Sequence, residues 1–554
     1  MKKTRILILL TLICICFLCL CTRKLLDVPT FRSDDTVLGI SVVSIDDVIK
    51  DKEFETTIQG SLFFENMPMP YDVGSGVYYI PQNMTEANWE GNITVQATDS
   101  DGDTFYLCAS EDDAYWSDKH SAISENHIFE IYGISKDSFC RMKMVVTGTP
   151  IIALEIENTK TIEVTLEEDP DQYLHGAEEE YYGSFCLFDP GNTIRNYNLV
   201  ESNVKFHRKG VSSKYYDKPS YSLKLRDVIG EDAKQSLLGL RESHSWKLNS
   251  LYTDENRIRE KTASQIWEGL ANSNTNVDAD GPRMEYVEVF LDNNYIGLYC
   301  LVEAVDEEQL SLTEGEYLYK AVNWDVPSLE QVQESIADKW NVCSSMRLRY
   351  PKEIKDYKAA WEPIAKYLDV FYYSVDFDYD SALELVDMNN LADMMFFIMT
   401  IGGADNTYKN MYFSWQQNEN GCYCMVQVPW DLDLTFGKLY DNEKKKPVFN
   451  PHTEWVFSET TLPRFKLSDV ERMGDEVYRR WLMQREGILL TETIEELFVS
   501  NRDYLIETGA MKREAARWEL PKECTEIEYL VDFQRERMEW LDTYFAVWTG
   551  QIAE

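Results

Sequence analysis

The chain is poor in positive charge and in histidine. Its 554 residues include 96 Asp and Glu against 54 Lys and Arg, which gives a formal net charge of −42, and it has 6 His. A negative field of this size repels nucleic acid, so we expect no DNA or RNA partner. Any phosphate-binding site must therefore collect its cations locally. The scattered His offer no partner set for a catalytic triad, which argues against a hydrolase of that type.

Cysteine pairs with metal-binding spacing are also lacking beyond the N-terminal segment. Eight of the 12 Cys follow residue 100, and none of these eight forms a C-x-x-C pair. A zinc ribbon is therefore not supported. We expect most of these residues to be buried free thiols, because a chain of this length does not need disulfides for stability.

One long apolar run is present, at the N terminus. Ile6 to Cys21 is interrupted only by Thr11 and follows Lys2, Lys3 and Arg5. The run is shorter than the roughly 20 residues that usually span a bilayer. The pattern predicts a signal-anchor over residues 1–24, with a cleaved signal peptide as the alternative. In either case we expect the rest of the chain to be extracytoplasmic, at the cell surface through a membrane anchor or secreted after cleavage.

The remaining sequence has the composition of several folded units. Its content of 44% hydrophobic and 13% aromatic residues indicates a globular protein. Residues 25–50 are polar and predict a linker. Short alternating runs separated by turn residues over 51–148 predict a small antiparallel all-β sandwich. The acidic stretch 99–103 resembles a calcium loop but lacks its Gly and its final Glu, so we interpret it as a hairpin turn.

Strands dominate residues 149–310, and helices dominate residues 311–548. Runs such as Ile151–Ile156 and Ser220–Leu225 come first, and the clearest helical patterns, Ala359–Tyr373 and Met388–Thr400, come later. One further hairpin is expected within Met411–Val428. This order predicts an α+β fold, and more specifically a protein-kinase-like two-lobed domain with its N-lobe over 149–310 and its C-lobe over 311–548.

Two acidic clusters carry the clearest chemistry, and the first lies near residue 405. Asp405 and Asn410 have the Asp-x-x-x-x-Asn spacing of a kinase catalytic loop, in which the carboxylate faces the acceptor hydroxyl and the amide reaches a metal ion. Lys409, between them, is placed to neutralise the departing γ-phosphate. The alternative is an Asx-turn that caps the preceding helix and begins the hairpin.

The second cluster is Asp431 and Asp433, which follow an apolar run. In a strand, side chains two residues apart share one face, and two carboxylates this close repel each other unless a cation lies between them. We predict Asp431 as the principal metal ligand and Asp433 as the second, with Asn410, for Mg²⁺ or Mn²⁺ bound with ATP. A surface turn is the alternative.

The nucleotide phosphates require positive charge. Lys224 lies between two leucines in a predicted strand and is the first candidate to pair with the α- and β-phosphates, and Lys218 is its rival. Either residue is otherwise an ordinary solvated lysine. The loop 209–213 offers Lys209, one Gly, and the hydroxyls of Ser212 and Ser213 near the phosphates.

Three further residues complete the predicted nucleotide site. Glu260, in the following helix, is a candidate partner for the lysine, and Arg259 is a candidate phosphate contact. Glu303 ends a strand where a hinge between lobes would expose its backbone to adenine.

Together these residues resemble the CotH family, the spore-coat-protein-H kinases with an atypical protein-kinase fold, over about residues 149–545. The most specific matches are Asp405-Asn406 with Lys409-Asn410, and Trp430-Asp431-x-Asp433 with Phe436-Gly437. The resemblance implies ATP- and magnesium-dependent phosphate transfer to Ser or Thr of a protein outside the cell or at its surface. It also implies Asp405 as catalytic acid/base and Asp431 as the metal carboxylate.

The sequence differs from the family pattern in one loop, and two other functions are alternatives to a kinase. Lys209 and Val211 stand where the family usually has Arg and Asn, so the phosphate loop departs from the family pattern at these two positions. A pseudokinase-like domain that serves as a non-catalytic adhesion or scaffold module is the main alternative. A metal-dependent glycan-active enzyme is disfavoured, because an acid and a nucleophile must lie at least about 5 Å apart across the glycosidic bond.

Overall fold

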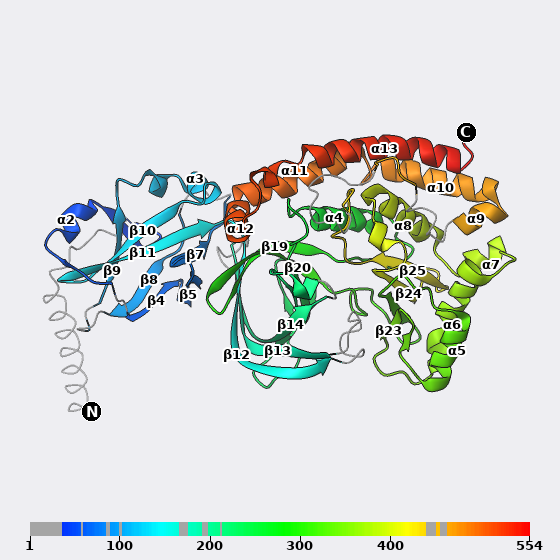
Figure 1. The fold of residues 1–554 in the computed structure, drawn as a ribbon, viewed down its shortest axis with the longest axis horizontal. Helices are drawn as coiled ribbons and strands as arrows, with labels where there is room; N and C mark the ends of the chain where they lie inside the picture. Colours follow the sequence, from blue (N-terminus) through cyan, green and yellow to red (C-terminus); the bar gives the residue numbers. More distant parts are fainter. Residues whose placement is uncertain are drawn as a thin grey trace, which may run out of the picture.

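The computed structural model describes residues 36–56, 59–84, 89–98, 102, 104–164, 176–190, 198–210, 213–438, 450–454 and 463–553. The predicted signal segment over residues 1–24 lies outside these ranges, as do Ser212 and nearly all of the acidic stretch 99–103. Among the residues described, no helix is both long enough and apolar enough to cross a membrane. The fold is mixed α+β, with a β-rich first part and a helical later part, as predicted (Figure 1).

The N-terminal unit consists of two sheets that share one core. Leu62, Phe64 and Ile93 of the smaller sheet pack with Ile131 and Met144 of the larger one. The larger sheet contains β1 (Thr36–Val37), β2 (Ile40–Val43), β3 (Glu53–Phe54), β6 (Tyr71–Asp72), β7 (Val77–Pro81), β9 (Tyr106–Ser110), β10 (Ile128–Ile134) and β11 (Ser138–Thr147). The smaller sheet contains β4 (Gln59–Phe64), β5 (Met67–Pro68) and β8 (Ile93–Thr98).

This unit differs from the predicted antiparallel all-β sandwich. It includes the helices α2 (Ile45–Ile49) and α3 (Lys119–Ser124), and the 3₁₀ turn η2 (Ala114–Ser117). The pairs β2–β9 and β7–β11 are parallel. Residues 36–50, predicted as part of a linker, form β1, β2 and α2, because Leu38 and Ile40 are buried in the core of the unit.

A closed barrel follows, in the order β12-β13-β14-β15-β18-β20-β19 (Figure 1). Its strands are β12 (Ile151–Val164), β13 (Gly176–Asp189), β14 (Asn198–Lys209), β15 (Ser220–Arg226), β18 (Ser245–Asn249), β19 (Met284–Leu291) and β20 (Asn294–Glu303). Alternate residues fill the interior, such as Leu223 and Leu225, or Trp246 and Leu248, because successive strand side chains point to opposite faces. The β14–β15 connection carries the 3₁₀ turn η3 (Ser213–Tyr215), and β16 (Gln235–Ser236) pairs with β17 (Glu242–Ser243) beside the barrel.

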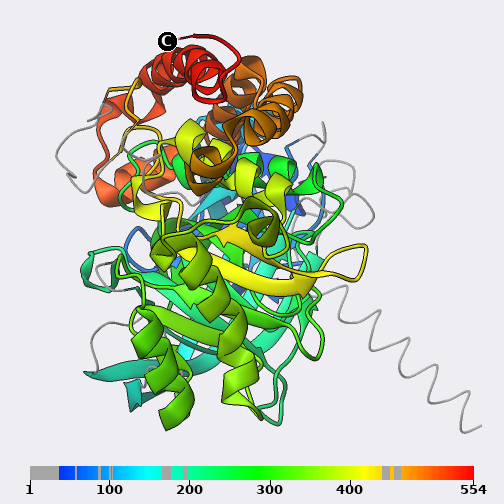
Figure 2. The same ribbon diagram turned by 90° about the vertical axis from the view of Figure 1, so that its right-hand side faces the viewer.

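A second sheet, in the order β22-β23-β21-β24-β25, lies among the later helices (Figures 1 and 2). Its strands are β21 (Tyr317–Ala321), β22 (Val342–Cys343), β23 (Met346–Tyr350), β24 (Met411–Gln417) and β25 (Tyr423–Pro429). The predicted hairpin is therefore confirmed as β24 and β25.

The helices pack with this sheet into the largest core. They are α4 (Arg259–Asn272), α5 (Leu329–Asp338), α6 (Tyr357–Leu368) with the π-turn η4 (Asp369–Tyr373), α7 (Tyr379–Leu383), α8 (Met388–Ile401), η5 (Ala404–Asn406), α9 (Pro463–Ser468), α10 (Val470–Arg485), α11 (Thr491–Glu507), α12 (Ala510–Trp518), η6 (Lys522–Thr525) and α13 (Glu528–Trp548). Both predicted helical patterns are confirmed, in α6–η4 and in α8. The α4 helix belongs to the same core, which joins the barrel side of the molecule to the helical side.

Candidate active site

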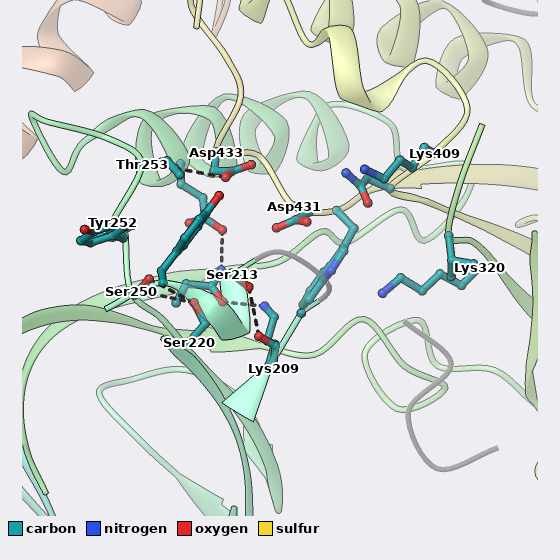
Figure 3. A pocket seen from close by; sticks show the side chains of 18 residues that line it. Lys209, Ser213, Ser220, Ser250, Tyr252, Thr253, Lys320, Lys409, Asp431 and Asp433 are labelled. Atoms are coloured by element: carbon teal, nitrogen blue, oxygen red, sulfur yellow. Dashed lines mark hydrogen bonds between the residues drawn. The ribbon is translucent and has the colours of Figure 1, made fainter. Parts of the chain in front are cut away.

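A polar cavity is lined by residues from the rim of the barrel and from the second sheet. Its lining residues are Lys209, Gly210, Ser213, Tyr216, Ser220, Asn249, Ser250, Leu251, Tyr252, Thr253, Glu260, Lys320, Val322, Lys409, Asn410, Trp430, Asp431 and Asp433. In Figure 3, Asp431 lies near the centre, with Lys209 below it and with Lys320 and Lys409 to its right. Side chains far apart in the sequence, basic and acidic alike, therefore meet in one cavity.

The loop near residue 405 lies at the edge of this cavity. The α8 helix ends at Gly402, which has a left-handed conformation, so Asp405 does not cap it. The Oδ2 atom of Asp405 accepts hydrogen bonds from Lys409 Nζ at 2.9 Å and from Asn410 Nδ2 at 2.8 Å. Lys409 and Asn410 line the cavity, and Asp405, with a side chain 6% exposed, lies directly behind them.

A buried amide joins this loop to the second acidic segment. Asn406 Nδ2 donates to Trp430 O at 2.7 Å and to Asn410 O at 3.4 Å, while Trp430 N donates to Asn410 O at 2.8 Å. Asn406 is fully buried. Asn406 belongs to the Asp405-Asn406 match with the family, but its role was not predicted, because its two partners are main-chain carbonyls that leave no side-chain pattern.

Asp431 and Asp433 both line the cavity, but not as neighbours on one strand face. The strand β25 ends at Pro429, and Asp431 has a left-handed backbone with φ of 59°. Asn410 has the same conformation, with φ of 57°. Asn and Asp tolerate this region because their short polar side chains can bond locally, and such strained residues cluster at functional sites. The predicted strand geometry is therefore wrong for this pair.

The acidic side chains perturb one another. Burial raises the pKa of Asp433 well above its ordinary value, and the neighbouring charges of Asp431, Glu260 and Asp405 raise it further. Thr253 Oγ1 donates to Asp433 Oδ2 at 3.2 Å. Burial, followed by the charge of Asp431, also raises the pKa of Glu260 to about 7. Such a cluster favours either a bound proton or a nearby cation.

The donor set suits a hard divalent ion. Carboxylates of Asp431 and Asp433 with the amide oxygen of Asn410 are the oxygen ligands that Mg²⁺ takes in proteins, usually with phosphate oxygens and water completing the shell. In the described part of the chain, no three or more His, Cys, Asp or Glu side chains group around a point that could hold a metal ion. Two carboxylates and an amide would leave most of the coordination shell of such an ion to other oxygen atoms.

Three lysines supply the positive charge of the cavity. Lys209 Nζ donates to Asn249 Oδ1 at 2.6 Å, and Lys409 pairs with Asp405. Lys320, on β21, is 3% exposed, and the sequence reasoning missed it. The only local signal is a lysine within the otherwise apolar strand Tyr317–Ala321.

The loop after β14 approaches the cavity through its backbone. Gly210 has φ of +95°, and a Cβ there would lie 2.0 Å from Ser213 Oγ, so no other residue fits without rearrangement. Ser213 Oγ donates to Lys209 O at 3.0 Å. Ser213 lines the cavity, and its predicted companion Ser212 lies outside the described residues.

Neither lysine favoured from the sequence lines the cavity. Lys218 is fully buried, and its Nζ donates to Glu514 Oε1 at 2.6 Å and to Leu298 O. Lys224 pairs in register with Lys205, whereas Lys209 pairs with Ser220 at the end of the same β14–β15 ladder. Four residues of extended strand separate the two rows by about 13 Å. The end of the β14–β15 ladder, where Lys209 and Ser220 lie, therefore lines the cavity, and the middle of the ladder does not.

Arg259 and Glu303 are also placed elsewhere. Arg259 is buried and forms an ion pair with Asp254. Glu303 is buried and accepts from the backbone N–H of Arg241 at 2.6 Å and from Arg283 Nε at 3.2 Å. Both residues satisfy structural contacts outside the lining set of the cavity, whereas Glu260 lies within it.

Comparison with known families agrees with this geometry. The family model described as CotH kinase protein matches residues 206–541. The chain belongs to this family. The matched range extends from β14 to α13, includes every lining residue of the cavity, and leaves out the N-terminal unit. No curated protein matches the chain.

Proposed function

We propose that this CotH family member is an ATP- and Mg²⁺-dependent atypical protein kinase with a two-lobed domain, which phosphorylates Ser or Thr of extracytoplasmic or cell-surface proteins. Family membership supports kinase activity and ATP as a substrate. The observation that carries the proposal is the convergence of Asp431, Asp433 and Asn410 with three lysines in one cavity. The location outside the cytoplasm rests on the N-terminal signal pattern alone.

The residues divide into an acceptor side and a metal side. Asp405 is assigned as the acid/base on its spacing from Asn410 and on family membership, and its carboxylate, held by Lys409 Nζ, lies just behind the lining of the cavity. Asp431 and Asp433, with Asn410, hold the metal ion. When bound, that ion would neutralise charge on the phosphate oxygens.

The phosphate side is assigned to Lys209 and Lys320, with Ser213 and the backbone around Gly210. These groups line the cavity, whereas Lys218 and Lys224 do not. The nucleotide role that the sequence favoured for Lys224 therefore moves to the end of β14. Arg259 and Glu303 take structural roles in this proposal.

Labelled ATP tests the assignment. Purified full-length protein is incubated with [γ-³²P]ATP, Mg²⁺ and a mixture of Ser/Thr-containing proteins, beside the variants Asp405→Asn and Asp431→Asn. We expect each variant to lose at least about 100-fold in labelling rate, because each removes a group that acts in the transition state. Asp376→Asn is a matched control, since Asp376 is exposed and does not line the cavity.

Two results would contradict the proposal. Equal labelling by the wild type and Asp431→Asn would remove the metal site from the reaction. Thermal stabilisation of the wild type by Mg²⁺–ATP without any labelling would instead support the non-catalytic scaffold.

A further inference from the structure

The indole of Trp430 lies next to two ammonium groups in the cavity. Lys209 Nζ lies 5.1 Å from the centroid of this indole, and Lys320 Nζ lies 5.0 Å from it. The ring of Tyr412 lies 5.1 Å from Lys320 Nζ on another side and packs edge-on against Trp430, at 6.0 Å and 88°. Within about 6 Å, the negative face of an aromatic ring attracts a cation.

This arrangement holds two like charges close together. Because both lie over one ring, the ammonium groups are no more than about 10 Å apart, a distance at which like charges in a partly buried site repel. An indole restrains an ammonium through its negative face and adds no formal negative charge of its own.

The ligand that suits two such cations is a polyanion with several charged groups in a row. A single phosphate or carboxylate engages one ammonium well, whereas a chain of phosphates can engage both. Asp431 follows Trp430 directly, so metal-binding oxygens lie beside the two lysines. The chemical class is therefore a polyphosphate that carries a divalent cation.

We propose that Trp430 is a positioning residue that holds Lys209 and Lys320 as a two-lysine clamp for the polyphosphate chain of the nucleotide. This inference rests on the proposed function of the same cavity. It adds that Trp430 positions the lysines of that cavity for a triphosphate. Trp430 acts through the lysines and is itself 4% exposed.

Affinity for inorganic tripolyphosphate tests the clamp without any transfer step. Isothermal titration of the full-length protein compares the wild type with Trp430→Leu and Trp430→Phe. We expect Trp430→Leu to weaken binding about tenfold, and Trp430→Phe to retain most of the affinity because it keeps an aromatic face. Trp415→Leu is the matched control, since Trp415 is half-buried on the same hairpin, stacks on Tyr423 at 5.8 Å, and does not line the cavity.

A double-mutant cycle separates positioning from general structural support. If Trp430 acts through Lys209, then Lys209→Gln costs at least about threefold less affinity in the Trp430→Leu background than in the wild type. Should Trp430→Leu fail to fold, as judged by circular dichroism, the cycle is run with Trp430→Phe, where a smaller coupling of the same sign is expected.

The outcomes distinguish the clamp from the kinase proposal. Unchanged tripolyphosphate affinity in Trp430→Leu, or an equal cost of Lys209→Gln in both backgrounds, overturns the clamp. Wild-type protein that binds no tripolyphosphate also overturns it. Binding with the expected coupling, but without labelling of any protein by ATP, supports the clamp and overturns the kinase proposal.

Discussion

At the scale of single residues, Glu260 and Lys209 are linked through an amide instead of a direct ion pair. Asn249 Oδ1 accepts from Lys209 Nζ, and Asn249 Nδ2 donates to Glu260 Oε1. The neutral amide of Asn249 fixes the positions of both side chains relative to each other without neutralising the charge of either. The carboxyl of Glu260 therefore stays under the influence of Asp431, which together with burial raises its pKa to about 7.

The raised pKa of Glu260 predicts a pH-dependent stability for the metal-free protein. The folded state binds this proton more tightly than the unfolded state, whose pKa is near 4.5. Its contribution to the free energy of unfolding is therefore largest below pH 4.5 and is lost as the pH rises to about 7, by an amount on the order of 3 kcal/mol. Urea unfolding in the presence of EDTA measures this effect. Between pH 5 and pH 7.5, the free energy of unfolding should fall less for Glu260→Gln than for the wild type.

Asp433 also has a raised pKa, to which the charge of Glu260 contributes, so the difference between the two proteins measures the combined effect of Glu260 on itself and on Asp433. Identical pH dependence of the two proteins would show that Glu260 is not protonated in the folded state near neutral pH.

Sequence reasoning found the acidic residues of the cavity more reliably than the basic ones. The Asp405–Asn410 spacing and the Asp431–Asp433 pair are local patterns, and Asn410, Asp431 and Asp433 do line the cavity. The lysines are different, because Lys224 and Lys320 both look like lysines in apolar strands. Whether a lysine reaches the cavity depends on its position along the strand and on how the barrel closes. The residues next to each lysine in the sequence predict neither of these two factors.

At the scale of elements, α12 fastens the barrel to the helical part. Glu514 accepts from Lys218 Nζ at 2.6 Å, from Arg257 Nε at 2.9 Å and from Leu298 N at 2.7 Å. Burial alone would raise the pKa of the Glu514 carboxyl, but Lys218 and Arg257 together outweigh it and lower the pKa, which favours the ionised form. Gly297 makes the approach possible, since a Cβ there would lie 2.4 Å from Glu514 Oε2.

This network predicts that Lys218 stabilises the fold rather than binding nucleotide. Lys218→Met leaves the buried Glu514 carboxylate with one cation fewer. We therefore expect the free energy of unfolding to fall by about 3 kcal/mol, which is at the lower end for a broken buried ion pair because Arg257 remains. The first urea-unfolding transition measures the loss, and the KM for ATP at a permissive temperature should stay within about threefold of the wild type.

Lys352→Met serves as the control, because the side chain of Lys352 is 74% exposed in its pair with Glu307. A large rise in KM with unchanged stability would return Lys218 to the nucleotide site.

The elements also show what periodicity does and does not predict. The helices α6 and α8 are predictable because their apolar residues repeat at helical spacing over more than three turns. In the N-terminal unit, the alternating runs within 51–148 predict strands but not their pairing, and β1 and β2 lie in the predicted linker. Alternation identifies a strand with one buried face, and it is the same for the parallel β7–β11 pair as for an antiparallel one.

At the scale of the whole molecule, Arg513 joins the N-terminal unit to the kinase-family region. Its guanidinium donates to Asn126 Oδ1 at 2.9 Å and pairs with Glu288 Oε1 at 2.6 Å. A second contact lies at the β19–β20 turn, where Val73 N donates to Asn293 O at 2.9 Å. In Figure 1, α12 lies between the N-terminal unit and the barrel. The N-terminal unit is therefore docked against the rest of the chain by polar contacts.

The docking predicts that Arg513→Ala loosens the N-terminal unit. The change leaves the fully buried Glu288 without its cation, which costs about 3–5 kcal/mol. Limited proteolysis should cut the variant near residue 148 faster than the wild type. Arg535→Ala, which removes a half-exposed arginine on α13, should leave the cleavage rate unchanged. Equal cleavage of Arg513→Ala and the wild type would contradict the docking role.

The arrangement of units was not predictable in the way the fold class was. A change from strand patterns to helical patterns along the chain is enough to indicate an α+β protein. The contact between Arg513 and Asn126 spans 387 residues, and nothing near either residue points to the other.

The buried amide of Asn406 limits how this cavity can open. Since one side chain donates to the main-chain oxygens of both Trp430 and Asn410, a movement of the loop that contains Asp405 also carries the segment that contains Asp431. The two acidic segments are therefore tied together by this amide. Under the proposed function, widening of the cavity for a nucleotide depends on the facing rim of the barrel, which bears Lys209 and Gly210.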